Sequence, residues 1–514
     1  MVSLPPTPTR PGRVLAVLVL SALLIWIDST VLGIALERLA DPVDGLGASP
    51  GQLQWAIGIY SLLFATALFA AGALGDRYGH RTVLMAGLVV FGASSAWAAW
   101  AGDPVALILA RATMGLGGAM IMPTSMAILG RTFAPERRAG AIAIWSSAAG
   151  VGVAAGPVLG GLLLARFWWG SVFLINLPLV AVALVGAALT LPNPRSEQRR
   201  RLDVRGLGLS TLGLLALSYG LIEGGHQNGW SRWQVWASIA AGLVLLAAFL
   251  YSEAREHDPS FDPRLFRNRH FAAGNVALGA LFLTITGQAF YQTFYLQGAR
   301  GLSPLQAGLL ALPGATGVVL GSPLGARLAA RFGIARVSGT ALAVFTVCLV
   351  LNLTFTVDTS LVWFCFLGMI AGLAIGAAVA PTTAGVVATL PMDRIGAGSA
   401  VSNAIRQVGS VLGVAVIGTI VSSTYQHAIA PSLPANLRDT AGESAEATRH
   451  AAAELGQPQL IPLANDAFIQ AMHTAAVVAA IFTLAGTVVL ILAFRNRRAP
   501  ATGAADAELS SVPG

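Results

Sequence analysis

Ionisable side chains stand inside four of the long apolar runs of this sequence. Asp28 lies near the centre of the first run, and Arg111 lies inside the fourth. A carboxylate at low dielectric can bind and release a proton near physiological pH as its surroundings change, or it can attract a cation. The alternative is a structural anchor that hydrogen-bonds Ser29 and Thr30. A guanidinium keeps its proton, so Arg111 would hold a carboxylate or backbone carbonyls in place for proton coupling, or act as a structural pin.

Two further ionisable residues are weaker candidates. Glu223 lies close to the outer end of the seventh run, where it either takes part in proton coupling or is simply hydrated at the membrane interface. Arg406, in the thirteenth run, either pins neighbouring groups or extends toward the inner face. An ionisable group at bilayer depth costs several kcal/mol unless it is paired or hydrated, so each of these residues is a functional candidate.

A short charged loop follows the second run. Gly75 and Gly79 permit a tight turn, Asp76 can cap the next helix, and Arg77 and Arg81 face the cytoplasm. The loop is either an ordinary turn or a hinge that locks and releases neighbouring helix ends.

A ridge of glycines marks the fifth run. Gly152, Gly156 and Gly160 recur at four-residue spacing, with Pro157 and Gly161 beside them. Glycines at this spacing let another helix pack closely, and the proline removes a backbone hydrogen bond and bends the helix. We expect a deformable packing seam.

Membrane-spanning helices are the elements that must position these residues. The chain has 514 residues, of which 55% are hydrophobic and 11% charged, and its mean hydropathy is +0.71. An ordinary soluble domain has about 25% charged residues. We count about fourteen apolar runs of the roughly 20 residues that a membrane helix needs. The first run is longer than a signal-peptide core and lacks an obvious cleavage site, so we interpret it as an uncleaved helix. The sequence predicts an all-α polytopic membrane protein.

The basic residues predict the orientation. All 31 are arginine, and most fall in alternate loops that are inner if the N-terminus is cytoplasmic. The positive-inside rule then places both termini in the cytoplasm and requires an even number of helices. This topology accounts for the net charge of +8, so we expect no nucleic-acid partner.

Charged linkers divide the chain into two bundles with an inserted pair of helices. The predicted segments are a cytoplasmic N-terminal tail (1–13), a six-helix bundle (14–190), a basic cytoplasmic linker (191–205), two inserted transmembrane helices (206–251), a second cytoplasmic linker (252–269), a C-terminal six-helix bundle (270–494) with an outer loop at about 425–466, and a cytoplasmic C-terminal tail (495–514). A faint repeat supports this division, because glycines and arginines around Gly325 and Gly333 echo the loop that begins at Gly75. Duplicated halves around a midplane site are a common transporter plan.

Several activities are excluded by composition. Without lysine the chain cannot form a Walker A phosphate loop or a lysine Schiff base. Cys348 and Cys365 each lie in an apolar run and are interpreted as core packing, and the seven histidines show no metal-binding spacing. We therefore expect no enzyme, no cofactor and no metal, and a proton gradient as the energy source.

A substrate pocket would lie between the two halves near the midplane. Aromatic faces accept flat hydrophobic or cationic molecules, although most such residues in helices only pack. The candidates, aromatic and polar, are Trp26, Trp55, Tyr60, Trp145, Gln288, Tyr291, Gln292, Phe294, Asn403 and Arg406.

Three of these features together resemble a known family. The loop from Gly75 to Arg81, Arg111 with its glycine-rich continuation, and the glycines around Pro157 are similar, in order and spacing, to signature motifs of the major facilitator superfamily. The sequence around Asp28 and the number of runs resemble its fourteen-helix drug/proton antiporter branch. The resemblance implies the major facilitator fold, with Asp28 and Arg111 in proton coupling and Asp76 and Arg77 in a conformational gate. The sequence departs from the family pattern at two places. The second-half loop has Ala326 where an acidic residue might stand, and the thirteenth run has Arg406 but no carboxylate, which argues against a preference for dications.

The resulting hypothesis is a proton-coupled antiporter that exports hydrophobic or cationic drugs and toxic compounds by alternating access. We expect a monomer in the inner membrane of a bacterium. The alternatives are a dedicated exporter or symporter of one metabolite, lipid or self-made antibiotic, and a membrane scaffold that transports nothing.

Overall fold

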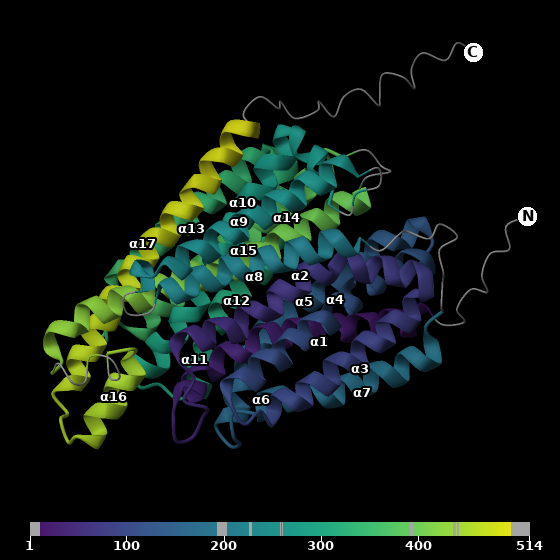
Figure 1. Cartoon of the computed structure of the whole chain (residues 1–514). Helices are drawn as coiled ribbons and strands as arrows, with labels where there is room; N and C mark the ends of the chain where they lie inside the picture. The colour runs from purple at the N-terminus through teal and green to yellow at the C-terminus, as the bar shows by residue number, and fades with distance from the viewer. Residues whose placement is uncertain are drawn as a thin grey trace, which may run out of the picture.

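The computed structural model describes residues 11–192, 203–225, 229–256, 259, 261–390, 395–434, 438 and 442–494. Across these residues the chain is helical, with short connections (Figure 1). The all-α class is confirmed. Residues 1–10 and 495–514 of the predicted tails, residues 193–202 of the basic linker, and parts of the ranges 252–269 and 425–466 lie outside the described residues.

The first half of the chain forms one bundle. Its helices are α1 (Pro11–Ala40), α2 (Pro50–Tyr78), α3 (His80–Ala99), α4 (Pro104–Thr132), α5 (Pro135–Leu164), and the short α6 (Ser171–Leu174) continued by α7 (Asn176–Thr190). The helix α1 packs against α5 and α7, while α4 packs between α2 and α3.

A pair of helices follows this bundle. The pair consists of α8 (Val204–Gly224) and α9 (Trp233–Arg255), joined through the 3-10 turn η1 (Gly229–Ser231). The helix α8 lies against α2 and α15, so the pair covers the place where the two bundles meet laterally.

The second half forms the other bundle. Its elements are η2 (Pro263–Arg267), α10 (Arg269–Thr293), the π-helical turn η3 (Phe294–Ala299), α11 (Pro304–Leu310), α12 (Leu312–Phe332), α13 (Ile334–Leu351), η4 (Asn352–Thr354), α14 (Leu361–Val387), α15 (Ile395–Ile429), η6 (Ala430–Ser432), α16 (Ala445–Glu454) and α17 (Leu460–Phe494). The strongest packing is between α12 and α14 and between α10 and its neighbours α15 and α17. Part of the predicted outer loop is therefore helical, since it contains α16.

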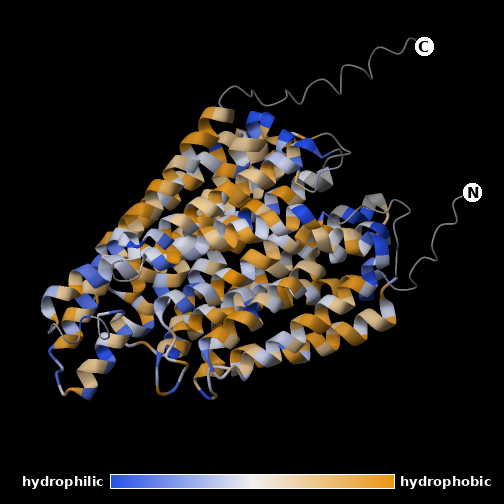
Figure 2. Ribbon diagram, viewed as in Figure 1, coloured by the Kyte–Doolittle hydropathy of each residue, from blue (hydrophilic) through white to orange (hydrophobic). Residues whose placement is uncertain are grey.

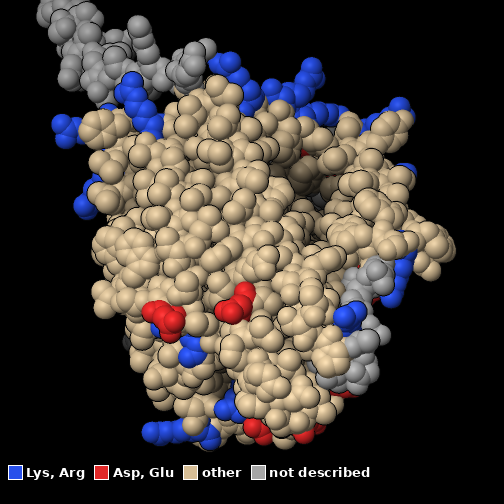
Figure 3. Space-filling model, turned by 90° about the vertical axis from the view of Figure 1, so that its left-hand side faces the viewer, with Lys and Arg blue, Asp and Glu red and all other residues tan. Residues whose placement is uncertain are grey.

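Most of the long helices have the length and hydropathy of membrane spans, as the apolar runs of the sequence predict. In the described part of the chain, 13 helices are long and apolar enough to cross a membrane, and α5 adds a helix of 30 residues that is apolar over Ala148–Leu164. Hydrophobic residues dominate the length of the helices, and polar residues gather at the two ends (Figure 2). Arginines crowd one end of the face drawn in Figure 3 and are nearly absent from the belt below it. We call the end where α1 begins and α17 finishes the terminal end, and the opposite end the distal end.

Local signals in the two halves match each other. Ser49 is the N-cap of α2 and Ser303 is the N-cap of α11, each in a capping box with the glutamine three residues later. Gly79 and Gly333 then separate the next helices with φ of 99° and 88°, a backbone conformation that favours glycine. The spacing from serine to glycine is identical in the two halves, so the repeat extends over a whole helical hairpin.

The two bundles touch at the distal end. The Thr293 hydroxyl donates to the Gly33 carbonyl at 2.7 Å, and the Gln297 amide donates to the Ile34 carbonyl at 2.8 Å. Nearby, Gly161 of α5 lies directly against the α11 backbone, and Gly308 of α11 lies against the Pro157 carbonyl. We call these interactions the distal contact. It fixes α1 and α5 to the second bundle.

Candidate functional site

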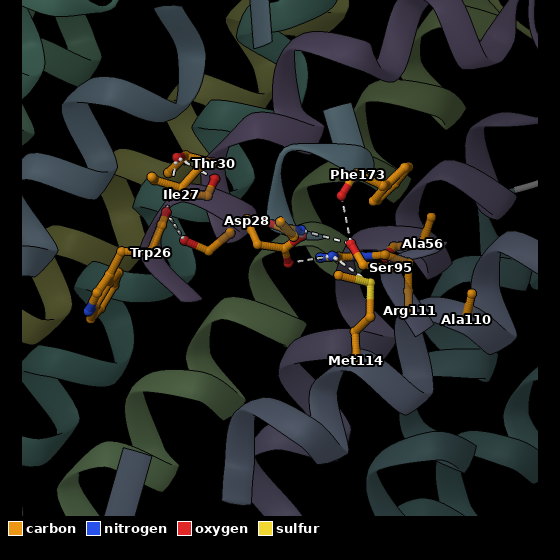
Figure 4. A network of polar contacts seen from close by, with 12 residues as sticks. Trp26, Ile27, Asp28, Thr30, Ala56, Ser95, Ala110, Arg111, Met114 and Phe173 are labelled. Atoms are coloured by element: carbon orange, nitrogen blue, oxygen red, sulfur yellow. Dashed lines mark hydrogen bonds and ion pairs between the residues drawn. The ribbon is translucent and has the colours of Figure 1, made fainter. Parts of the chain in front are cut away.

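The centre of the first bundle contains a buried ion pair. Arg111 Nη1 on α4 lies 2.6 Å from Asp28 Oδ2 on α1, and the two side chains are 2% and 0% exposed. Figure 4 shows the carboxylate and the guanidinium facing each other across the bundle interior. Both charges stand inside apolar helices, so each compensates the other where water does not reach.

Arg111 is held by the neighbouring helix α2. Its Nε donates to the Ala56 carbonyl at 3.3 Å, and its guanidinium carbon lies 4.4 Å from the centre of the Tyr60 ring. Gly115, one turn along α4, lies directly against the Tyr60 carbonyl, so a side chain there would push the helices apart. The glycine-rich continuation after Arg111 therefore permits the close helix contact that positions the guanidinium.

Asp28 has a second partner on α7. Asn176 Nδ2 donates to Asp28 Oδ1 at 3.0 Å and to Ser95 Oγ at 2.9 Å. The Ser95 hydroxyl in turn donates to the Phe173 carbonyl at 2.8 Å. All of these donors point toward the carboxylate or its support, so the arrangement suits ionised Asp28. A proton on Asp28 would remove the charge that Arg111 compensates and would turn one of the two acceptor oxygens into a donor, which opposes the N–H group bound to that oxygen.

The glycine ridge of α5 packs beside this network. A Cβ added at Gly152 or Gly156 would collide with Trp26 or Thr30, and one at Gly160 would lie 2.9 Å from the Val31 side chain. The Trp26 and Thr30 side chains flank Asp28 on α1 (Figure 4). Gly161, the residue after Gly160, lies against α11 and belongs to the distal contact. The seam thus joins the buried charge to the interface between the bundles.

The residues of the predicted charged loop lie at the terminal end, but they are mostly helical: Gly75, Asp76 and Arg77 belong to α2 and Arg81 to α3. The prediction that Asp76 caps the next helix is wrong, because Gly79 is the N-cap of α3 and no side chain caps it. The Gly79 amide donates to the Gly75 carbonyl, and Asp76 Oδ1 lies 3.4 Å from His80 Nε2. Arg81 donates to the Ala188 carbonyl of α7 at 2.6 Å, which fixes α3 to α7. Arg77 is exposed, with its guanidinium carbon 5.4 Å from the centre of the Tyr78 ring.

The other predicted residues are distributed over several elements. Glu223 is half-buried on α8, which packs on α9, α2 and α15 rather than beside Asp28. Arg406 on α15 donates to Asn403 Oδ1 at 2.6 Å, and Asn403 is exposed.

The other predicted pocket residues, aromatic and polar, divide into a buried group and a half-buried group. In the buried group, the Tyr60 ring contacts the Arg111 guanidinium, and the Tyr291 hydroxyl accepts a hydrogen bond from the Asn352 amide at 3.5 Å. Phe294 packs edge-on against Phe290. The half-buried candidates are Trp26, Trp55, Trp145, Gln288 and Gln292. Two apolar pockets described at the side of the molecule, of about 260 and 430 Å³, contain none of the predicted residues.

Sequence reasoning missed the asparagine and the serine of the network. Asn176 and Ser95 are 0% exposed. The available signal was an amide and a hydroxyl within apolar runs, but neutral polar residues are too common in membrane helices to be singled out by type.

Comparison with known proteins identifies the family. The sequence profile of the Major Facilitator Superfamily matches residues 18–414. The multidrug efflux pump LfrA of Mycolicibacterium smegmatis is 34% identical over 95% of this chain and 97% of its own. The methyl viologen resistance protein SmvA of Salmonella typhimurium is 31% identical over 89% and 90%. The tetracenomycin C resistance and export protein of Streptomyces glaucescens is 32% identical over 80% and 76%.

A solved structure agrees with the fold. An inward-facing, unoccupied bacterial homologue of the human lysosomal transporter Spinster superposes with a TM-score of 0.67, at 18% identity, over 96% of this chain and 99% of its own. The chain is a multi-pass membrane transporter and not an enzyme. It belongs to the major facilitator superfamily, in the fourteen-helix branch of its drug-efflux relatives.

Proposed function

We propose that this protein is a proton-coupled antiporter that exports hydrophobic drugs and other toxic compounds from the cytoplasm by alternating access. The Asp28–Arg111 ion pair carries the proposal. It is the buried, charge-compensated group whose carboxylate can change protonation state inside the first bundle. We further propose a bacterial cell membrane with both termini in the cytoplasm, so that the terminal end is the inner one.

The coupling follows from what each atom can donate or accept. Ionised Asp28 accepts from Arg111 and Asn176, which holds α1, α4 and α7 together. A proton arriving at Asp28 removes the charge that Arg111 compensates, so these contacts weaken. The same helix α1 supplies the carbonyls of the distal contact, Gly33 and Ile34. In an antiport cycle the proton reaches Asp28 from the outer side and leaves to the cytoplasm, and α1 couples this change in its contacts to the opening and closing of the distal end.

The test is drug-induced proton release from everted membrane vesicles energised by respiration, read with a pH-sensitive dye. Wild-type protein should dissipate the gradient with several unrelated hydrophobic drugs. Asp28→Asn and Arg111→Ala should abolish this release, whereas Ser29→Ala, which changes an exposed neighbour, should preserve it. Undiminished proton-linked efflux in Asp28→Asn would overturn the coupling role of Asp28.

A dedicated exporter is the second candidate. Three relatives have names that refer to a single natural product. They are the tetracenomycin C protein, the probable actinorhodin transporter of Streptomyces coelicolor and the methylenomycin A resistance protein of Bacillus subtilis. In the same vesicles, a dedicated exporter would respond to one compound class and ignore unrelated dyes.

A further inference from the structure

Charge at the interface between the bundles is unevenly distributed. Asp28 is sealed in the first bundle and already satisfied by Arg111 and Asn176. A cationic cargo would have to break these interactions to reach the carboxylate. The pair as a whole is neutral and offers little to a charged molecule.

Arg406 has no comparable compensation. Within the described part of the chain it forms one hydrogen bond, from Nη2 to Asn403 Oδ1, and its guanidinium carbon lies 5.7 Å from the centre of the Phe282 ring. No carboxylate forms an ion pair with it among these residues, and its buried Nε has no hydrogen-bond partner there. A guanidinium offers five N–H donors, so most of its donors remain available. A buried donor without a partner requires an explanation.

The geometry of α15 directs Arg406 toward the space between the bundles. Gly409 and Gly413 pack on α10, and Gly418 packs on the α2 side chain Gln54. At 3.6 residues per turn, Arg406 and Asn403 fall between these two contact directions. Residues on the other side of α15 line the lateral pockets next to α8 and α9; they are Ala404, Ile405 and Val408.

The Phe282 ring on α10, which lies near Arg406, also faces the space between the bundles. Phe282 and Thr293 are eleven residues apart, about three helical turns, and therefore share a face of α10. Thr293 reaches α1 of the first bundle through its bond to Gly33. Phe282 thus faces the first bundle closer to the terminal end, with Arg406 beside it.

We propose that Arg406, Asn403 and Phe282 form a recognition site for lipophilic molecules that carry an anionic group, such as an aromatic carboxylate or phenolate. The guanidinium donates to the anion, the Asn403 amide donates beside it, and the Phe282 ring contacts the aromatic body. This inference rests on the proposed export function and names its preferred cargo. It favours acids over the cations that the sequence alone suggested.

The experiment measures binding without a proton gradient. Purified protein in nanodiscs is titrated with 9-anthracenecarboxylate, its methyl ester, and 9-anthracenylmethylammonium, using energy transfer from tryptophan and empty discs as the blank. Hydrogen bonds to a charged group contribute about 1.5–3 kcal/mol, which corresponds to about tenfold or more in affinity. Wild-type protein should bind the acid about tenfold more tightly than the ester, and the ammonium most weakly.

Variants separate recognition from a structural pin. Arg406→Gln should remove the acid-over-ester preference, Arg406→Lys should retain part of it, and Arg406→Glu should favour the ammonium. Arg331→Gln, which removes an exposed arginine at the terminal end, should keep the wild-type ratio. If Arg406→Gln weakens acid and ester equally, or if wild-type protein prefers the ammonium, the proposal is wrong. The wild-type preference remains a test even if a variant fails to fold.

The two proposals can fail separately. Binding of the acid through Arg406 without drug-induced proton release would refute the antiport function alone. Proton-linked efflux with no charge preference would refute the recognition site alone.

Discussion

The stability of the buried ion pair can be separated from its role in coupling. In Asp28→Asn, Arg111 keeps its positive charge on a side chain that is 2% exposed. It loses the carboxylate oxygen that lies 2.6 Å from its Nη1. Removing one partner of a buried pair costs about 3–5 kcal/mol. The amide oxygen of the introduced asparagine could still accept from Arg111, and Asn176 could turn its amide so that the oxygen, which has no partner in the described structure, faces the new donor. We therefore expect the lower end of this range, about 3 kcal/mol.

The neutral double variant is the informative comparison. Asp28→Asn combined with Arg111→Gln removes both charges while keeping polar groups of similar size. It should regain most of the stability lost in Asp28→Asn, because no uncompensated charge remains. It should not regain proton-linked export, because no carboxylate is left to bind a proton.

The assay is a double-mutant cycle on the free energy of unfolding in mixed micelles, with Ser29→Ala as the neighbouring control. Arg111→Gln alone completes the cycle. Each single variant should cost about 3 kcal/mol or more and the double variant little, so the coupling energy between positions 28 and 111 should be about 5 kcal/mol. A double variant less stable than Asp28→Asn would refute the electrostatic account of the pair. A double variant that still couples efflux to protons would refute the assignment of Asp28.

Three other contacts give measurable expectations. Asn176→Leu should lower the free energy of unfolding by about 1.5–3 kcal/mol, because it removes a hydrogen bond to a buried carboxylate. Gly156→Val should abolish transport even if the protein still inserts, since a side chain there collides with Thr30; drug efflux and membrane abundance are measured together. Thr293→Val should loosen the distal contact and raise the population open at the distal end, seen as longer distances between spin labels at Asp44 and Asp358.

The glycine and threonine variants have matched controls. Gly58→Ala places a methyl group on α2 where nothing lies within 4 Å, so it should leave transport unchanged. Thr474→Val removes an exposed hydroxyl that bonds only within α17, so it should leave the label distances unchanged. Unaltered efflux in Gly156→Val, or unaltered distances in Thr293→Val, would contradict the role given to that contact. Wild-type stability in Asn176→Leu would show that the asparagine contributes nothing to holding Asp28.

The sequence identified the charged members of the site but not their partnership. A charge within an apolar run stands out because of its solvation cost, which singled out Asp28 and Arg111 separately. Their meeting depends on how α1 and α4 cross, and the residues are 83 positions apart. Periodicity within one helix contains no information about such a crossing.

Residue type was a weaker guide to the predicted pocket. Tyr60 and Trp145 were equal candidates as aromatic residues in spans. In the structure, Tyr60 contacts Arg111 inside the bundle, whereas Trp145 is half-buried on α5. Which face of a helix meets another helix depends on tertiary packing, and mostly apolar helices give little amphipathic signal to reveal it. The hairpin repeat, in contrast, was present in local signals, since Ser49 and Ser303 each begin a capping box.

The helix α1 unites the three parts of the proposed mechanism over a short distance. Asp28 is the proton-binding group, Thr30 lies against the glycine seam of α5, and Gly33 accepts the hydrogen bond from the second bundle. Five residues of helix separate Asp28 from Gly33, about 7.5 Å along the axis. No long chain of side chains is needed to connect protonation with the distal contact, because a small rotation of one rigid helix changes all three interactions. Arg406 lies on the other bundle, outside this helix. Cargo recognition and proton binding are therefore expected to be separable by mutation.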